Sequence, residues 1–236
     1  KLCGILNGID MTVNDPATDP ALAANYDVNT VQDGKPICKK AMLEQFGMDQ
    51  DGSPAMGMVT RLVGHKGLDL VRSVAEGLLQ QGIQLVILGS GEHGYEAFFN
   101  DLAYRHPGRV GVYIGFNATL AQQIYAGSDI FLMPSKSEPC GLSQMVACRY
   151  GAVPVVRETG GLKDSIKDSG DGQGNGFTFA NYSAHDLYQA CWRAKEGYWQ
   201  KDGWPVLVHR AMECDFSWSN SAKSYEGLYN EVVNLW

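Results

Sequence analysis

Short apolar runs alternate with amphipathic segments along most of the chain. Apolar runs of strand length predict buried strands, and apolar residues at helical spacing predict helices. The strands predicted in this way are 55–60, 84–88, 110–114, 130–134, 153–156 and a last short one at 177–179. The predicted helices are 67–81, 95–104, 120–125 and 142–150, followed by two or three more within 183–236. This alternation predicts a doubly wound α/β fold, in which helices cover both faces of a parallel sheet.

The first fifty residues are patterned more weakly. Residues 4–10 predict a short strand interrupted by an Asn-Gly turn, and residues 12–36, rich in Asp, Asn, Pro and Thr, predict a surface loop. A short helix is predicted over 39–46, closed by a glycine. We therefore divide the chain into a lead-in segment, 1–50, and one α/β domain with C-terminal helices, 51–236.

Two cations stand between the first predicted strand of the domain and the helix that follows it. They are Arg61 and Lys66. Ligands of such sheets bind outside the carboxyl ends of the strands, so this loop is on the expected ligand side. Cations are unfavourable at a helix N-terminus unless an anion lies between them. Two interpretations stay open: a phosphate site, or solvated side chains on a surface loop.

A glycine-rich turn, G-x-G-x-x-G at 89–94, follows the second strand of the domain. In dinucleotide-binding folds this fingerprint is accompanied by an acidic residue roughly 20 positions further on. Gly115, Phe116 and Asn117 stand there instead, which argues against NAD. Gly89 and Gly91 would still let a phosphate or sugar approach the backbone. Phe116 is either a core aromatic or a flat platform for a nucleobase.

The loop after the fourth strand combines a carboxylate, a thiol and a helix start. Glu138 is positioned to bind sugar hydroxyls, and Gly141, Leu142 and Ser143 would offer unpaired N–H groups to an anion. Cys140 is interpreted as a structural or ligand-contacting thiol rather than a nucleophile, because no histidine is fixed beside it in the sequence.

The loop after the fifth strand carries Thr159, Gly160 and Gly161, which predict a tight turn and helix entry or a further ligand contact. A D-x-D pattern at 49–51 resembles a metal-binding motif of sugar-nucleotide enzymes, but its flanking glycines favour a turn. The five histidines have neither metal nor triad spacing, and we expect no metal or other cofactor.

Composition narrows the class of protein. With 44% hydrophobic and 19% charged residues and a net charge of −7, the chain has the make-up of a globular protein and lacks the basic stripe of a nucleic-acid-binding protein. No apolar run reaches the roughly 18–20 residues of a membrane span. Six scattered cysteines favour a reduced, cytoplasmic protein. The chain begins at Lys1 and is interpreted as a piece of a longer protein.

Taken together, these loops resemble the bacterial glycogen synthases and the starch synthases, retaining glucosyltransferases of the two-domain GT-B fold. The most specific match is E-P-C-G-L combined with T-G-G-L at this spacing. The matching stretches are G-I-L-N-G-I-D at 4–10, T-R-L-V-G-H-K-G-L-D-L at 60–70, G-S-G-E-H-G-Y-E at 89–96, P-S-K-S-E-P-C-G-L-S-Q at 134–144, R-Y-G-A-V-P-V-V-R-E-T-G-G-L-K-D at 149–164 and D-F-S-W at 215–218. The resemblance implies that the chain is the C-terminal, Rossmann-like half of such an enzyme, with residues 1–50 facing the other domain.

The resemblance also implies an activity, the transfer of glucose from ADP-glucose to the non-reducing end of an α-1,4-glucan with retention. Arg61 and Lys66 would hold the diphosphate and stabilise the departing ADP, and with Glu138 they form the implied catalytic group. Phe116 would lie against adenine, and Asn7 would approach the donor from the interdomain side.

The remaining implied donor contacts are backbone and small-residue positions. They are Gly89, Gly91, Cys140, Gly141, Leu142, Ser143, Thr159, Gly160 and Gly161. Cys140 would contact the donor glucose together with the implied catalytic carboxylate.

Departures from the family pattern set further expectations. Val146 stands where related enzymes often have a second Glu, and the K-T-G-G-L loop of the other domain is absent from the sequence. We expect the chain to bind nucleotide but to turn over little by itself, with the glucan held mainly by the other domain. Two alternatives are another GT-B transferase that uses a UDP-sugar, and a non-catalytic glycan-binding module. The module would use the tryptophans at 192, 199, 204, 218 and 236.

Overall fold

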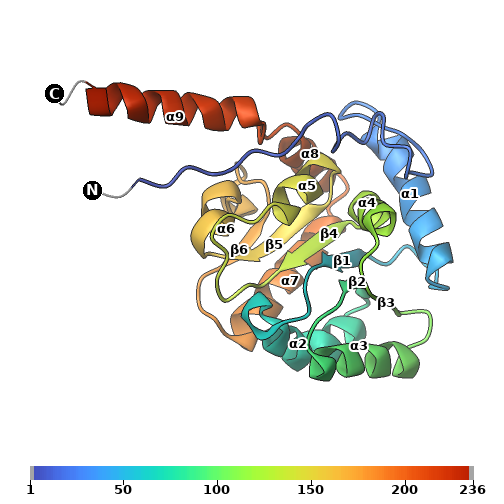
Figure 1. The fold of residues 1–236 in the computed structure, drawn as a ribbon. Helices are drawn as coiled ribbons and strands as arrows, with labels where there is room; N and C mark the ends of the chain where they lie inside the picture. The colour runs from blue at the N-terminus through green and yellow to red at the C-terminus, as the bar shows by residue number, and fades with distance from the viewer. Residues whose placement is uncertain (1–2, 234–236) are drawn as a thin grey trace.

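The computed structural model describes residues 3–233, which form a parallel sheet with helices on both faces (Figure 1). All strand pairs are parallel, in the order β3-β2-β1-β4-β5-β6. The strands are β1 (Ala55–Val59), β2 (Gln84–Gly89), β3 (Val110–Ile114), β4 (Ile130–Met133), β5 (Val153–Arg157) and β6 (Phe177–Phe179). The six strands predicted within residues 51–236 and the doubly wound fold class are therefore confirmed.

Helices follow the strands as the alternation predicts. Figure 1 shows α2 and α3 on one side of the sheet and α4 and α5 on the other. The helices are α1 (Val31–Gln45), α2 (Leu68–Gln80), α3 (His93–Arg105), α4 (Ala118–Gly127), α5 (Ser143–Arg149), α6 (Gly160–Ser165), α7 (Ala184–Tyr198), α8 (Gly203–Met212) and α9 (Trp218–Val233). The last three confirm the helices predicted within 183–236. Within residues 3–233, no helix is long and apolar enough to cross a membrane.

The first helix begins earlier than the sequence pattern predicts. The predicted loop over 12–36 is wrong for its last part, because α1 begins at Val31 and continues through Pro36. A proline here removes one backbone donor and normally disfavours a helix interior. The helix forms because it packs on α4 and buries Val31, Cys38 and Met42. Burial against a distant element thus overrides the local breaker signal.

The strand predicted over residues 4–10 is also wrong. This segment is extended, but its one ladder contact is an isolated bridge between Ile9 and Ser217. The hydroxyl of Ser221 donates to the carbonyl of Leu6, so the segment is tied to the last part of the chain. The pairing stops after this one bridge because α9 begins at Trp218, directly after Ser217, so within the described part of the chain no second strand forms beside residues 4–10. That residues 1–50 face another domain stays a prediction.

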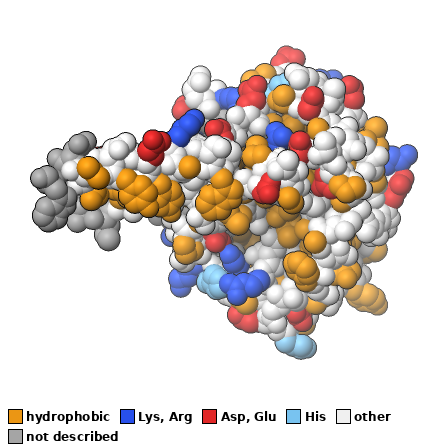
Figure 2. Space-filling model, turned by 45° about the horizontal axis from the view of Figure 1, so that its top comes forward, with side chains coloured by type: hydrophobic (Ala, Val, Ile, Leu, Met, Phe, Trp, Pro, Cys, Tyr) orange, Lys and Arg blue, Asp and Glu red, His pale blue; other side chains and the backbone are white. Residues whose placement is uncertain are grey.

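The last helix extends away from the rest of the molecule, with the N-terminal segment beside its first turns (Figure 1). Of its described side chains, Ser221 alone is buried. Figure 2 shows hydrophobic side chains along this projection. The exposed large ones on α9 are Trp218, Tyr225, Tyr229, Val232 and Val233.

The strand order reverses between β1 and β4. The crossovers that follow β1 and β4 run to opposite sides of the sheet at this switch point (Figure 1), and ligands of such sheets bind outside the carboxyl ends of the strands there. The loop after β1 and the loop after β4 therefore lie side by side, and these are the two loops in which the sequence places its charged candidates.

Candidate functional site

The loops after β1 and β4 are in direct backbone contact. The N–H of Lys136 donates to the carbonyl of His65 at 2.9 Å. Gly67 has a φ of 77°, and a Cβ at this position would lie 2.1 Å from the carbonyl oxygen of Pro134. Both the left-handed conformation and the close approach require glycine. The two loops are thus held in a fixed relation at the switch point.

Across this contact, two of the predicted catalytic residues form an ion pair. The Nζ atom of Lys66 lies 2.5 Å from an Oε atom of Glu138, and their side chains are only 17% and 11% exposed. The hydroxyl of Ser135 lies 3.3 Å from the same carboxylate oxygen. The sequence identified both charged residues, but their direct contact comes from the fold. A partly desolvated pair of this kind is costly to break.

The third predicted catalytic residue, Arg61, is exposed and lines a cavity of about 240 Å³. The walls of the cavity come from the carboxyl ends of β1, β2 and β3. Among the described residues, no hydrogen bond or ion pair engages the Arg61 guanidinium. This guanidinium is therefore available to an anion, as a planar group with five N–H donors.

Phe116 stands at the same cavity and is 90% exposed. The alternative that it is a core aromatic is therefore wrong. Val59, Leu88 and Ala121 supply apolar wall beside it. A flat apolar ligand fits such a surface, because each of its faces can be covered by hydrocarbon. These three wall residues carried no chemical signal in the sequence and were not predicted as site residues.

The glycines of the G-x-G turn serve the packing of two loops. A Cβ on Gly89 or Gly91 would lie 1.9 or 2.4 Å from a backbone oxygen of the loop after β1. The N–H of Gly91 donates to the carboxylate of Glu96, and the N–H of Gly64 donates to the carboxylate of Glu92. Two carboxylates thus occupy the N-terminus of α3, where a dinucleotide would place its pyrophosphate. Contacts of Gly89 and Gly91 with a donor stay a prediction.

The loop before α5 presents unpaired backbone donors. Gly141 has a φ of 72°, and the Gln144 amide donates to the carbonyls of Cys140 and Gly141, which fixes the turn. In the part of the chain that the structure describes, the N–H groups of Gly141, Leu142 and Ser143 have no acceptor. These groups can bind an anion close to Lys66 and Glu138.

Cys140 is partly buried, and within residues 3–233 its thiol makes no hydrogen bond to a histidine. A nucleophilic thiol needs a base or another cause of a lowered pKa. The arrangement agrees with the interpretation of Cys140 as a contact residue. All six cysteines of the chain are free.

The glycine pair after β5 joins a third loop to the site. A Cβ on Gly160 would lie 2.2 Å from the Glu138 carbonyl oxygen, and one on Gly161 would lie 2.0 Å from the Cys140 carbonyl oxygen. The N–H of Gly161 donates to the Glu138 carbonyl at 3.1 Å. The turn interpretation is thus confirmed, with Thr159 as the residue before α6. Any contact of these three residues with a donor stays a prediction.

Further cations that the sequence analysis did not select flank this site. Arg157 donates to the carbonyl of Lys136 at 2.8 Å. The Tyr182 ring lies 5.4 Å from the Arg157 guanidinium and 5.7 Å from the Lys136 ammonium. Burial, and then a hydrogen bond to Asp69, raise the pKa of Tyr182. The cationic residues around the loops after β1, β4 and β5 are therefore more numerous than predicted. The sequence signal for Arg157 is its place at the carboxyl end of β5, two residues before the T-G-G loop.

Two remaining candidates lie elsewhere. Asn7 is exposed on the N-terminal segment, and no hydrogen bond among the described residues joins it to the loops of the sheet. Asp49 and Asp51 of the D-x-D pattern lie before β1, at the opposite end of the sheet. The N–H of Ser53 donates to the Asp51 carboxylate, which agrees with the predicted turn, and Asp51 also pairs with Arg109 at 2.7 Å. Within the described part of the chain, no three His, Cys, Asp or Glu side chains are grouped to hold a metal ion.

Comparison of the chain with known proteins shows which family it belongs to. The profile of the family described as "Glycosyl transferases group 1" matches residues 44–197. The chain is 48% identical over 236 residues to a glycogen synthase of Bacillus anthracis, covering 99% of this chain and 49% of that protein. It is 48% identical over 235 residues to a glycogen synthase of Geobacillus thermodenitrificans, covering 98% of this chain and 48% of that protein. The chain thus spans about half the length of the curated relatives it matches.

Solved structures agree with the same grouping. The catalytic domain of Starch Synthase IV from Arabidopsis thaliana, solved with ADP and acarbose, matches with a TM-score of 0.90 and 39% identity. That match covers 98% of this chain and 49% of that one. A sucrose-phosphate synthase from Thermosynechococcus elongatus matches with a TM-score of 0.65 and 17% identity, a likeness of fold alone.

Proposed function

Because the chain belongs to the group 1 glycosyl transferases, we propose that it forms the donor-binding half of a glycogen or starch synthase. The whole enzyme would transfer glucose from ADP-glucose to the non-reducing end of an α-1,4-glucan with retention. One observation carries the proposal. An apolar cavity with the exposed ring of Phe116 is continuous with Arg61, an uncompensated cation. This order of surfaces, first apolar and then cationic, fits a nucleoside diphosphate.

The nucleobase end uses the apolar cavity. Adenine would stack on Phe116 and lie against the side chains at the ends of β1 and β2. The structure of the plant starch synthase that matches this chain holds ADP, which supports an adenine nucleotide over a uridine nucleotide.

The diphosphate would lie between Arg61, Lys66 and the free N–H groups of Gly141 to Ser143. When the bond to glucose breaks, negative charge grows on the departing ADP. Cations and amides that are already in place stabilise that charge without reorganising. Glu138 would hold Lys66 in position through the 2.5 Å ion pair. Charge neutralisation by side chains makes a metal unnecessary in this proposal.

The donor glucose would lie against Glu138 and Cys140, close to the glycine pair Gly160 and Gly161. Cys140 has no adjacent base and would contact the sugar rather than attack it. The glucan acceptor would be held mainly by the other half of the enzyme, whose approach would exclude water from the activated donor. Free cysteines throughout the chain support a reducing, cytoplasmic setting, and the bacterial glycogen synthases that match the chain support a bacterial one.

Calorimetric titration of the chain with ADP, UDP and NAD tests the proposal. ADP should bind, and Arg61→Ala and Lys66→Ala should each weaken it about 10- to 100-fold, because each removes a charge-assisted hydrogen bond. Lys40→Ala is a matched control, since Lys40 is exposed on α1 with only an Oε atom of Glu44 nearby at 3.8 Å. Tighter binding of UDP than of ADP would favour a UDP-sugar enzyme. Saturable binding of NAD, or no nucleotide binding at all, would contradict the proposal.

A further inference from the structure

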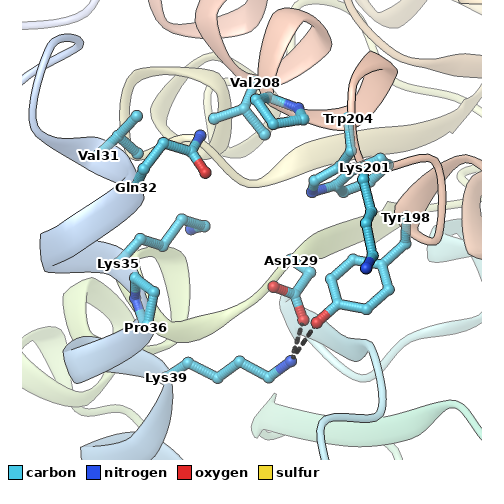
Figure 3. Close-up of a pocket in the computed structure, with 11 residues that line it drawn as sticks. Val31, Gln32, Lys35, Pro36, Lys39, Asp129, Tyr198, Lys201, Trp204 and Val208 are labelled. Carbon is cyan, nitrogen blue, oxygen red and sulfur yellow. Dashed lines mark hydrogen bonds and ion pairs between the residues drawn. The ribbon is translucent and has the colours of Figure 1, made fainter.

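A second cavity, of about 320 Å³, lies at the opposite end of the sheet from the donor cavity (Figure 3). Its floor includes Asp129, the residue directly before β4, and its walls are α1, the end of α7 and α8. This cavity shares no lining residue with the donor cavity, and the proposed donor binding does not involve it.

Two lysines in the wall have no donor left for a ligand. The Lys35 ammonium donates to the carbonyls of Tyr125, Ala126 and Tyr150, at the C-terminal ends of α4 and α5. The Lys39 ammonium donates to the Asp129 carboxylate at 2.6 Å and also to the Ser53 carbonyl and the Tyr198 hydroxyl. Three acceptors use all three protons of each ammonium group. These lysines therefore build the cavity rather than bind an occupant.

Other polar groups of the cavity have no partner among the described residues. They are the second carboxylate oxygen of Asp129, the side-chain amide of Gln32, the indole N–H of Trp204 and, at the rim, the Lys201 ammonium. Figure 3 shows the free Asp129 oxygen, the Gln32 amide and the Trp204 nitrogen around the same space. The cavity thus offers an acceptor (Asp129), a donor (Trp204) and, on an exposed side chain of its wall, an amide with both functions (Gln32).

The rest of the lining is apolar. Val31 and Pro36 line the cavity from α1 and Val208 lines it from α8, and the Trp204 ring adds an aromatic surface. The Trp204 ring is braced by Tyr198, whose ring lies edge-on with centroids 5.5 Å apart. Contact with the Tyr198 ring therefore holds the indole in place at the cavity wall.

This combination selects one class of ligand. The Lys201 ammonium at the rim, unpaired among the described residues, would attract an anion. Inside the cavity, however, an anion would face the free oxygen of Asp129, and the Lys35 and Lys39 ammonium groups have no donor left for it. A purely apolar ligand would leave the carboxylate, amide and indole groups unpaired, which is costly. A pyranose ring has hydroxyls around its edge and apolar C–H groups on its faces, so it satisfies both kinds of surface. The volume falls at the low end of the range of about 300–1,000 Å³ for ligand sites.

We propose that this cavity binds a glucose unit of an α-glucan, at a site separate from the donor cavity. The sugar class follows from the lining, whereas the choice of an α-glucan rests on the proposed function. A site on this face would tether the polymer to the enzyme. Such tethering raises the effective concentration of chain ends without contributing to the reaction itself.

The Trp204 indole N–H resonance of the chain, titrated with maltotriose, tests the inference. We expect a saturable shift of this resonance, which Trp204→Phe identifies by its loss. Gln32→Ala, a change of an exposed side chain, should weaken the binding about fivefold, the effect of one lost hydrogen bond. Trp199→Phe is the matched control, because Trp199 is a neighbouring exposed tryptophan outside the cavity lining. It should leave the titration unchanged.

Inorganic phosphate and ADP complete the experiment. A saturable response to phosphate without one to maltotriose would overturn the sugar assignment. A Trp204 resonance that maltotriose does not move would also overturn it. If ADP still binds at the donor cavity in that case, the proposed function stands and only this inference fails. If maltotriose shifts the Trp204 resonance while ADP does not bind, the sugar site stands and the donor proposal fails.

Discussion

Substitution of Phe116 by alanine is expected to lower the affinity for ADP while leaving the free energy of unfolding nearly unchanged. The Phe116 ring is 90% exposed, so in the unliganded chain it makes little contact with the core. Truncation in Phe116→Ala should therefore change the free energy of unfolding by no more than about 0.5 kcal/mol, the usual range for surface positions. The same truncation removes the proposed stacking surface for adenine from the cavity.

The expected loss of affinity follows from stacking energies. Stacking of a base on an aromatic side chain contributes about 1–3 kcal/mol, which corresponds to an increase of about 5- to 150-fold in the Kd for ADP. Phe116→Tyr keeps the ring face and should bind ADP nearly as the parent chain does. Inorganic diphosphate, which has no base, should bind all three chains equally.

Calorimetry for the Kd and thermal unfolding for stability would be measured on the same preparations. Tyr104→Ala is the matched control, because Tyr104 is an 86% exposed aromatic on α3 that is absent from the cavity lining. Affinity for ADP equal to that of the parent chain in Phe116→Ala would refute the stacking assignment. A large loss of stability would instead refute the claim that this ring is free of the core.

Three further perturbations test the site and the fold. Gly161→Ala places a Cβ 2.0 Å from the Cys140 carbonyl oxygen, so thermal unfolding should reveal a loss of about 1–3 kcal/mol through forced loop displacement. Lys66→Met and Glu138→Gln, combined in a double-mutant cycle of unfolding free energies, should show a coupling of about 0.5–3 kcal/mol, because both side chains are largely buried. Burial lowers the pKa of Lys35 from 10.5 to about 7, so between these values the unfolded chain binds more protons than the folded chain. Stability should therefore rise with pH from about 7 towards 10, by up to about 1.4 kcal/mol per pH unit, and the stability difference between the parent chain and Lys35→Met should follow this slope.

Each of these measurements has its own contrary outcome. Gly94→Ala is the control for the glycine change, since a Cβ there meets nothing within 4 Å, and equal stability of the two variants would contradict the close-approach argument. Additive effects in the cycle would mean that the ion pair is not coupled in solution. A stability difference between the parent chain and Lys35→Met that stays constant with pH would show that Lys35 keeps its ordinary pKa.

The sequence by itself determined the architecture of the sheet and the edge at which a ligand is expected. Strands buried on both faces need continuous apolar runs, and helices that cover them need one apolar face. Both patterns can therefore be recognised within a short stretch of sequence. The loops after the strands were located by the same reasoning, and with them Arg61, Lys66, Glu138 and Phe116. The resemblance of these loops to a known family indicates their chemistry without reference to any geometry.

Only the tertiary structure decided which of these residues meet. The pair of Lys66 and Glu138 joins loops 72 residues apart in the chain, and no local signal encodes that contact. The glycines at 89, 91, 160 and 161 suggested ligand approach, yet their immediate neighbours are backbone atoms of adjacent loops. The start of α1, misjudged because of its proline, depends on burial against α4.

The second cavity, at the opposite end of the sheet from the donor cavity, shows most clearly what only the tertiary structure decides. Gln32, Asp129 and Trp204 come from three separate segments, and none of them lies in a motif. Their side chains face one space because α1 and α8 pack beside the start of β4. A sequence pattern records the faces that a segment must bury, whereas a site of this kind depends on how distant segments are placed by packing. For that reason the loops of the proposed donor site could be located from the sequence and this cavity could not.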